Sequence, residues 1–204
     1  MKLYVHPMSS NARRAVLVAK HLQLPVEVEF VDLAKGAHRT PGYAALNPMT
    51  QVPTLVDGDF KLAESYAIMK YLTAKVPGQT LYPTDAAAQA KVDQWMFWCA
   101  NAWSPSVGAL NYENMIKAML GQGPADEGRV ARHHGLLARN GKVLDDALAG
   151  RSFLVGDSVT LADYAIAASL ITTVPAKLPV GDFANIQRWF AGIQALPAWQ
   201  AAAA

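Results

Sequence analysis

Three groups of polar residues stand where a chain can bind an anionic ligand. Ser9 and Ser10 follow a β-rich segment, Gln51-Val52-Pro53 precedes another, and Glu64-Ser65 opens a helical pattern. A helix start presents unpaired N–H groups and partial positive charge, which bind anions. Residues between a strand end and a helix start are the usual ligand-facing positions of an α/β sheet. We therefore expect these groups to meet at one sheet edge, around a ligand.

The single cysteine, Cys99, limits the thiol chemistry of the chain. One cysteine can form neither an intrachain disulfide nor a CxxC pair, and it excludes a cysteine-based zinc site. His133 and His134 are adjacent, so on a helix they point about 100° apart and form no i,i+4 metal pair. We expect no metal site, and thiol chemistry must use Cys99 or a thiol that a ligand brings.

The first part of the chain alternates strand and helix patterns. The predicted elements, in chain order, are a strand at 2–6, a helix at 12–23, a strand at 26–33, a helical turn at 43–46, a hairpin over 54–62 and a helix at 66–75. The handedness of β-α-β connections makes the first two strands parallel. We expect an α/β domain over residues 1–76.

The second part of the chain has a different composition. Residues 77–86 contain proline and glycine without periodicity, which is typical of a linker. Beyond them the sequence is alanine-rich with helical spacing. The helical stretches are 86–118, 126–150, 160–173 and 183–203. We expect residues 87–204 to form an all-α domain of four or five helices, so the fold class is α/β plus all-α.

The composition excludes several classes of protein. The 204 residues are 52% hydrophobic and 17% charged, so the chain folds rather than remaining disordered. A net charge of +2 provides no field that would attract nucleic acid or an anionic membrane surface. The first residues lack the apolar core of a secretory signal, and no apolar stretch is long enough to span a membrane. We expect a cytoplasmic protein without nucleic-acid or membrane partners.

Four motifs together carry a family resemblance. HPMSSNARR at 6–14, NPMTQVPTL at 47–55, LAESYAIMKYL at 62–72 and FLVGDSVTLADYAIA at 153–167 resemble a cytosolic glutathione S-transferase of the serine type, close to the theta and phi classes and their bacterial relatives. The resemblance implies a thioredoxin-like N-terminal domain with the glutathione site, a helical C-terminal domain and a homodimer. It implies no cofactor, because glutathione is a co-substrate.

The resemblance places the catalytic hydroxyl at Ser9, with Ser10 as the rival one residue later. A free thiol of pKa ~8.5 is only slightly ionised at neutral pH, and the thiolate is the nucleophile. A serine hydroxyl can donate a hydrogen bond to that sulfur, and the helix N-terminus also favours the anion. The serine that does not face the thiol is expected to cap the helix. Arg13 adds positive potential, or else pairs with a structural carboxylate.

The resemblance also assigns glutathione-binding residues. Pro53 matches the family's cis-proline, which turns the backbone of Val52 towards the cysteinyl part of the peptide. Glu64 and Ser65 match the pair that holds the γ-glutamyl ammonium and carboxylate, and Gln51 assists there. His38 matches a histidine near the glycyl carboxylate, with Arg39 as its local substitute. Thr50 stands where the family has glycine, a departure that puts the loop conformation in question.

The second substrate site is harder to read from the sequence. The residues that we assign to a pocket for the electrophile are Met8, Trp103, Tyr112 and Met115. Thr160 and Asp163 resemble the family's capping box, which has a structural role.

The leading functional hypothesis is an enzyme that adds the glutathione thiolate to small hydrophobic electrophiles, as in detoxification. The alternatives are a glutathione-dependent isomerase or dehalogenase, and a non-catalytic binding protein of the same fold. Met49 precedes the Gln51-Val52-Pro53 segment, where related classes insert an apolar side chain into the partner subunit, and it equally fits packing within its own subunit.

Overall fold

The computed structural model describes residues 1–203, and the chain divides into two compact units. Unit 1 contains Met1–Tyr82 together with the segment that begins at Leu196, and unit 2 contains Pro83–Ala195. The end of the chain therefore groups with the α/β part. The predicted all-α domain over residues 87–204 instead included this segment in the helical part.

Unit 1 is built on a four-stranded sheet. Its strands are β1 (Lys2–Val5), β2 (Glu27–Phe30), β3 (Thr54–Asp57) and β4 (Phe60–Ala63), in the order β2-β1-β3-β4. β1 and β2 are parallel, as the β-α-β pattern predicts, and the other pairs are antiparallel. Leu3 and Leu55 face each other in the register of β1 and β3, and both are fully buried. They form the centre of this sheet.

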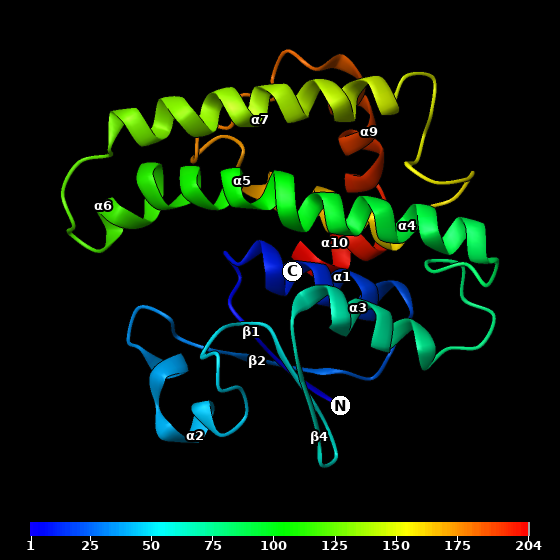
Figure 1. Cartoon of the computed structure of the whole chain (residues 1–204). Coiled ribbons are helices and arrows are strands. Elements are labelled where there is room, and N and C mark those ends of the chain that lie inside the picture. Colours follow the sequence, from blue (N-terminus) through cyan, green and yellow to red (C-terminus); the bar gives the residue numbers. More distant parts are fainter. Residues whose placement is uncertain (204) are drawn as a thin grey trace. The chain divides into compact units, whose positions relative to one another are not determined.

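The helices of unit 1 bring the predicted polar groups to their places. α1 (Ser10–His21) and α3 (Ser65–Ala74) pack side by side (Figure 1). Between β2 and β3 lie a short 3₁₀ turn (Ala37–Arg39) and α2 (Pro41–Ala44). The apolar stripes of α1 and α3 are buried, and Leu17, Ile68 and Leu72 have no exposed surface. Burial of these stripes holds the two helices against each other, and so places the polar residues at their starts.

The final helical run is broken where the sequence pattern appeared continuous. α9 (Ala184–Gln194) ends two residues before α10 (Pro197–Ala203) begins. Pro197 is the first residue of α10, where the N–H that proline lacks would have no partner within the helix. A proline at this position also cannot continue the preceding helix. α10 packs on α1 of unit 1, with Ala198 and Trp199 buried. The helical stretch predicted at 183–203 therefore consists of two helices.

Within its described residues, unit 2 contains helices and no strand, as predicted. The stretch from 86 to 119 runs through α4 (Ala86–Trp98), α5 (Ser104–Asn111) and α6 (Lys117–Met119), joined by wide π-helical turns at Cys99–Trp103 and Tyr112–Ile116. α7 (Glu127–Ala147) packs against α5. α8 (Leu161–Ala167) continues into a 3₁₀ turn, and every residue of α8 is buried.

The start of α8 is closed by side chains. The predicted capping box at Thr160 and Asp163 is present. The Asp163 carboxylate accepts hydrogen bonds from the backbone N–H groups of Leu154 and Thr160 and from the indole of Trp189, each at 2.9 Å. Burial raises the pKa of Asp163, while these donors oppose that rise. Asp163 thus ties the loop before α8 to α9.

Candidate functional site

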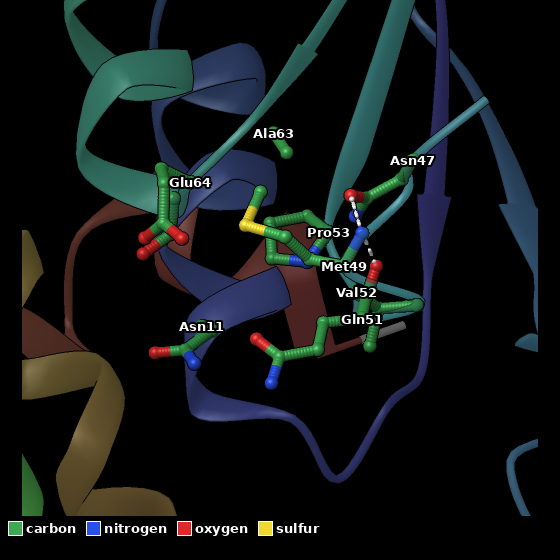
Figure 2. Close-up of a pocket in the computed structure, with 9 residues that line it drawn as sticks. Asn11, Asn47, Met49, Gln51, Val52, Pro53, Ala63 and Glu64 are labelled. Atoms are coloured by element: carbon green, nitrogen blue, oxygen red, sulfur yellow. Dashed lines mark hydrogen bonds between the residues drawn. The ribbon is translucent and has the colours of Figure 1, made fainter. Parts of the chain in front are cut away.

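A pocket opens on unit 1 between the start of α1, the segment before β3 and the start of α3 (Figure 2). Its lining residues are Asn11, Asn47, Met49, Gln51, Val52, Pro53, Ala63, Glu64 and Ser65. Five of the six residues that the sequence assigns to glutathione belong to this lining, and His38 does not. The fold therefore brings together two of the three polar groups, whereas Ser9 lies two residues before Asn11.

A buried network holds the Gln51-Val52-Pro53 segment. The Gln51 carbonyl accepts hydrogen bonds from the Tyr43 hydroxyl at 2.8 Å, from Asn47 Nδ2 at 2.9 Å and from the Thr54 hydroxyl at 3.2 Å. Asn47 and Thr54 are almost completely buried. Because buried polar groups are costly to leave unpaired, this network fixes the carbonyl of Gln51 and the direction of the chain that follows.

The segment beyond that carbonyl presents free backbone groups. The Val52-Pro53 peptide bond is cis, as the resemblance implies. Among the described residues, neither the N–H nor the carbonyl of Val52 has a hydrogen-bond partner. An extended peptide can pair with such groups as an added strand.

Thr50 adopts a left-handed backbone conformation, with φ of 52°. The family glycine at this position would take that conformation without cost, whereas a β-branched residue does so only under strain. The loop nevertheless keeps its course, because the Thr50 N–H bonds to the Asn47 carbonyl at 2.9 Å and the network holds the residues that follow. The substitution leaves the site's geometry in place and stores strain beside it.

Glu64 and Ser65 stand at the start of α3. Glu64 has φ of 68°, and its side chain makes no capping hydrogen bond to the helix. Within the described residues the Glu64 carboxylate has no hydrogen-bond or ion-pair partner, so it is available to a cationic group in the pocket. Ser65 is buried and is the first residue of α3, where the free N–H groups of the helix favour an anion.

The capping of α1 differs from the expected division between the two serines. Ser9, and not Ser10, is the N-cap, and its hydroxyl oxygen accepts a hydrogen bond from the Ala12 N–H at 3.2 Å. This does not exclude the thiol role of Ser9, because a hydroxyl accepts and donates at the same time. The capping bond uses a lone pair of Ser9 and leaves its O–H free to donate.

Arg13 has no carboxylate partner among the described residues, so the predicted alternative of a structural salt bridge is wrong. Its guanidinium lies over the ring of the buried Trp199, 4.5 Å from the ring centroid, and its Nε is buried without a partner. Arg13 is one helical turn beyond Ser9, and its N–H bonds to the Ser9 carbonyl at 2.9 Å. The contact with Trp199 of α10 thus holds the Arg13 charge near the start of α1.

His38 lies on the 3₁₀ turn between β2 and α2. Its ring is half-buried, and Nδ1 is buried without a hydrogen-bond partner. Burial, with the nearby Arg39 charge, lowers the pKa of His38. A neutral imidazole can donate one hydrogen bond, but it attracts a carboxylate less than an imidazolium does. Arg39 is exposed and remains the charged alternative.

The four residues assigned to the electrophile pocket have different surroundings. Met8 is exposed in unit 1, and Tyr112 and Met115 are half-buried in unit 2. Trp103 has no exposed surface, and its indole N–H bonds to the Ser169 hydroxyl at 2.8 Å. Trp103 is therefore a core residue of unit 2, which corrects its assignment to the pocket. The Tyr112 hydroxyl donates to Gln122 at 2.6 Å.

Several residues of the site, Ala63 among them, were not predicted from the sequence. Asn11 lines the pocket, and Asn47 and Tyr43 hold the segment beside it. Asn11 follows Ser9 and Ser10 directly at the start of the predicted helix, and this polar run was a usable signal. Tyr43 and Asn47 gave no such signal, because only the folded chain places them against the Gln51 carbonyl.

No group of three or more His, Cys, Asp or Glu side chains in residues 1–203 is arranged to hold a metal ion. No helix in the same part of the chain has the length and apolar character needed to cross a membrane.

The two units define the class of protein: a thioredoxin-like domain followed by a helical domain. The family model for the glutathione S-transferase N-terminal domain matches residues 1–74, and the model for the C-terminal domain matches residues 112–197. The chain belongs to the glutathione S-transferase family, as the motifs indicated, and its relatives place it with the theta and phi types.

Individual relatives match over most of their length. Glutathione S-transferase 3 of Zea mays is 36% identical, with 98% of this chain and 91% of that protein covered. Glutathione S-transferase theta-1 of Homo sapiens is 35% identical, over 88% of this chain and 76% of that protein. The structure of human glutathione transferase theta-2, in complex with glutathione and an unknown ligand, has a TM-score of 0.90, 28% identity and coverage of 98% and 85%.

Proposed function

We propose that this chain is a glutathione transferase in which the Ser9 hydroxyl stabilises the glutathione thiolate for attack on small hydrophobic electrophiles. The observation that carries the proposal is the pocket of unit 1, which gathers Gln51, Val52, Pro53, Glu64 and Ser65 from two separate segments. The family membership and the glutathione complex of a structural relative support the same ligand.

The pocket suits the γ-glutamyl end of glutathione. The free carboxylate of Glu64 complements an ammonium group, and the start of α3 at Ser65 complements a carboxylate. The residues that offer these two charges are neighbours at one end of the pocket, so they suit the end of the tripeptide that carries both an ammonium group and a carboxylate. The free backbone groups of Val52 then bind the cysteinyl residue.

The thiol chemistry takes place at the start of α1. The Ser9 O–H donates a hydrogen bond to the sulfur and so favours the thiolate over the thiol. The N-terminal partial charge of α1 and the Arg13 guanidinium act in the same direction. The thiolate attacks the electrophilic carbon and forms a thioether bond, and the leaving group departs with the electron pair. Where the electrophile is an activated alkene or an epoxide, the C–S bond forms as the C=C π bond or a C–O bond breaks, and the resulting anion takes a proton from solvent water.

The remaining features of the proposal come from the family. We propose a homodimer in the cytoplasm, with a second substrate site to which Tyr112 and Met115 of unit 2 contribute. These residues present partly exposed side chains, as a ligand-facing role requires. Glutathione is the co-substrate, and the proposal needs no additional cofactor.

The test begins with retention of the purified chain on immobilised glutathione and with calorimetric titration by free glutathione. A panel of aryl halides, activated alkenes and epoxides then measures conjugation. Binding together with conjugation is the expected result. Absence of binding would contradict the proposal. Binding without conjugation would favour a non-catalytic protein, and isomerisation or halide release without a conjugate would favour the alternative enzymes.

A further inference from the structure

Asn11 lines the pocket of unit 1 and had no assigned role in ligand binding. It lies in the first turn of α1, and its side chain is exposed to the pocket (Figure 2). Figure 2 shows Asn11, Gln51 and Glu64 around the same space, with Asn11 and Glu64 coming from the starts of two different helices. Asn11 is thus placed to contact the same part of a ligand as Glu64 and Ser65.

The neighbouring Arg14 determines how the Asn11 amide is oriented. Arg14 Nη1 donates a hydrogen bond to Asn11 Oδ1. A guanidinium has no acceptor, so the amide atom that faces it must be the oxygen. The amide plane is thereby fixed with its NH₂ group directed away from Arg14. Asn11 therefore offers donors, and not an acceptor, to the pocket.

Arg14 is itself held firmly. It is only 1% exposed, and its guanidinium lies over the ring of Tyr66 of α3, 4.7 Å from the centroid. A hydrogen bond from a charged donor polarises the amide and strengthens the hydrogen bonds that its NH₂ group gives. The buried Arg14 thereby strengthens the hydrogen-bond donors that the Asn11 side chain presents to the pocket.

We propose that the Asn11 amide donates a hydrogen bond to the α-carboxylate of the γ-glutamyl residue of glutathione, with Arg14 as the positioning residue. This inference rests on the proposed function and adds a binding residue to it. The α-ammonium and α-carboxylate of an amino acid share one carbon atom. If Glu64 holds the ammonium, the carboxylate must therefore lie among its neighbours, where Ser65 and Asn11 supply the donors.

The test compares two ligands on two proteins. The first ligand is glutathione, and the second is the analogue in which 4-aminobutyrate replaces the γ-glutamyl residue, which keeps the ammonium and lacks the α-carboxylate. Calorimetry measures the dissociation constant of each with wild type and with Asn11→Ala. We expect the substitution to weaken glutathione binding by about 10-fold or more and to change binding of the analogue by less than about 2-fold. Equal losses with both ligands would overturn the assignment.

Asn11→Asp provides the matched control. Aspartate has the shape of asparagine and still accepts from Arg14, so the helix start and its buried arginine keep their contacts. It offers no donor and brings a second negative charge to the ligand carboxylate. We therefore expect an unchanged melting temperature and a larger loss of glutathione affinity than with Asn11→Ala. Wild-type affinity in Asn11→Asp would overturn the assignment alone, whereas failure of the wild type to bind glutathione would overturn the proposed function as well.

Discussion

At the scale of single residues, Ser9 combines two hydrogen-bonding roles that substitutions can separate. Ser9→Ala removes both the cap of α1 and the proposed donor to the thiolate. We expect the pKa of bound glutathione to rise and kcat to fall by about 100-fold, with little change in the Kd for glutathione. The thiolate absorbance of the bound peptide, measured across a pH series, reports this pKa directly.

The capping role of Ser9 is controlled by a second variant. Glycine is nearly as good an N-cap as serine, whereas alanine costs about 1 kcal/mol. Ser9→Gly should therefore lose catalysis as fully as Ser9→Ala while keeping more of the stability. If Ser10→Ala causes the large loss of kcat and Ser9→Ala does not, the catalytic assignment is wrong by one residue.

Glu64 and Ser65 should show the opposite kinetic pattern. They contact the end of glutathione that is remote from the sulfur, so they contribute to binding rather than to thiolate stabilisation. We expect Glu64→Ala and Ser65→Ala each to raise KM for glutathione by about 10-fold, with a smaller change in kcat at saturation. Unchanged KM in both variants would remove the γ-glutamyl assignment.

The strained backbone of Thr50 predicts a stabilising substitution. A β-branched residue at φ of 52° destabilises the folded state by about 1–3 kcal/mol. Glycine removes this strain, but the greater conformational freedom of the unfolded glycine chain offsets part of the gain. We expect Thr50→Gly to stabilise the fold by about 1 kcal/mol in chemical denaturation. Thr50→Ala keeps the Cβ atom and should gain less. A destabilised Thr50→Gly would mean that the threonine side chain makes a compensating contribution.

At the scale of helices, Glu113 joins the π-helical turn before α6 to the start of α7. Its buried carboxylate accepts from the Asp126 N–H at 2.9 Å, and it pairs with Lys117 at 3.1 Å and Arg129 at 3.3 Å. The Asp126 hydrogen bond, with Lys117 and Arg129, holds the pKa of Glu113 below its ordinary value. Asp126 also caps α7, so these contacts fix where that helix begins.

This pKa shift predicts a pH-dependent stability. A carboxyl group with a lower pKa in the folded state binds fewer protons there than in the unfolded chain. The contribution of Glu113 to the stability of the fold is therefore fully present above the unfolded-state pKa of ~4.3. It is lost as the pH falls through the lower pKa of the folded state. Glu113→Gln should lower the stability at neutral pH and flatten the acid dependence, as measured by denaturation at a series of pH values. The exposed Glu127→Gln on α7 is the control, and an equal effect of both would contradict this role.

At the scale of the whole molecule, Met49 tests the proposed dimer. Its side chain lies at the edge of the pocket and is 49% exposed. An apolar side chain that inserts into a partner subunit is exposed in this way when one chain is considered alone. Two-fold symmetry makes such a contact occur twice, and a buried charge at each copy costs several kcal/mol. Met49→Asp should shift the protein towards monomer in sedimentation at micromolar concentration, with unchanged helical content.

A control for the added charge is available at Val174, which is 86% exposed. Val174→Asp places a charge in water, so it should leave the oligomeric state as in wild type. If Met49→Asp remains fully dimeric, Met49 contacts only its own subunit. Because Met49 also lines the pocket, the same variant should bind glutathione less tightly through repulsion by the new carboxylate.

The sequence by itself determined the order of the elements and most of the residues at the pocket. Periodicity located α1 and α3, and β-α-β handedness gave the parallel pair of strands. Glu64, Ser65 and the Gln51-Val52-Pro53 segment were predicted because their roles depend on local chain geometry and a short motif. These features are readable because a helix start or a strand end is decided by residues close in sequence.

Only the tertiary structure decided the features that depend on distant contacts. Trp103 is a core residue because Ser169 lies opposite its indole, and Arg13 stacks on Trp199 because α10 belongs to unit 1. The orientation of the Asn11 amide follows from a buried arginine, whose burial no local pattern shows. Such contacts arise from packing between segments far apart in the chain, and packing is fixed only when all the apolar faces are buried together.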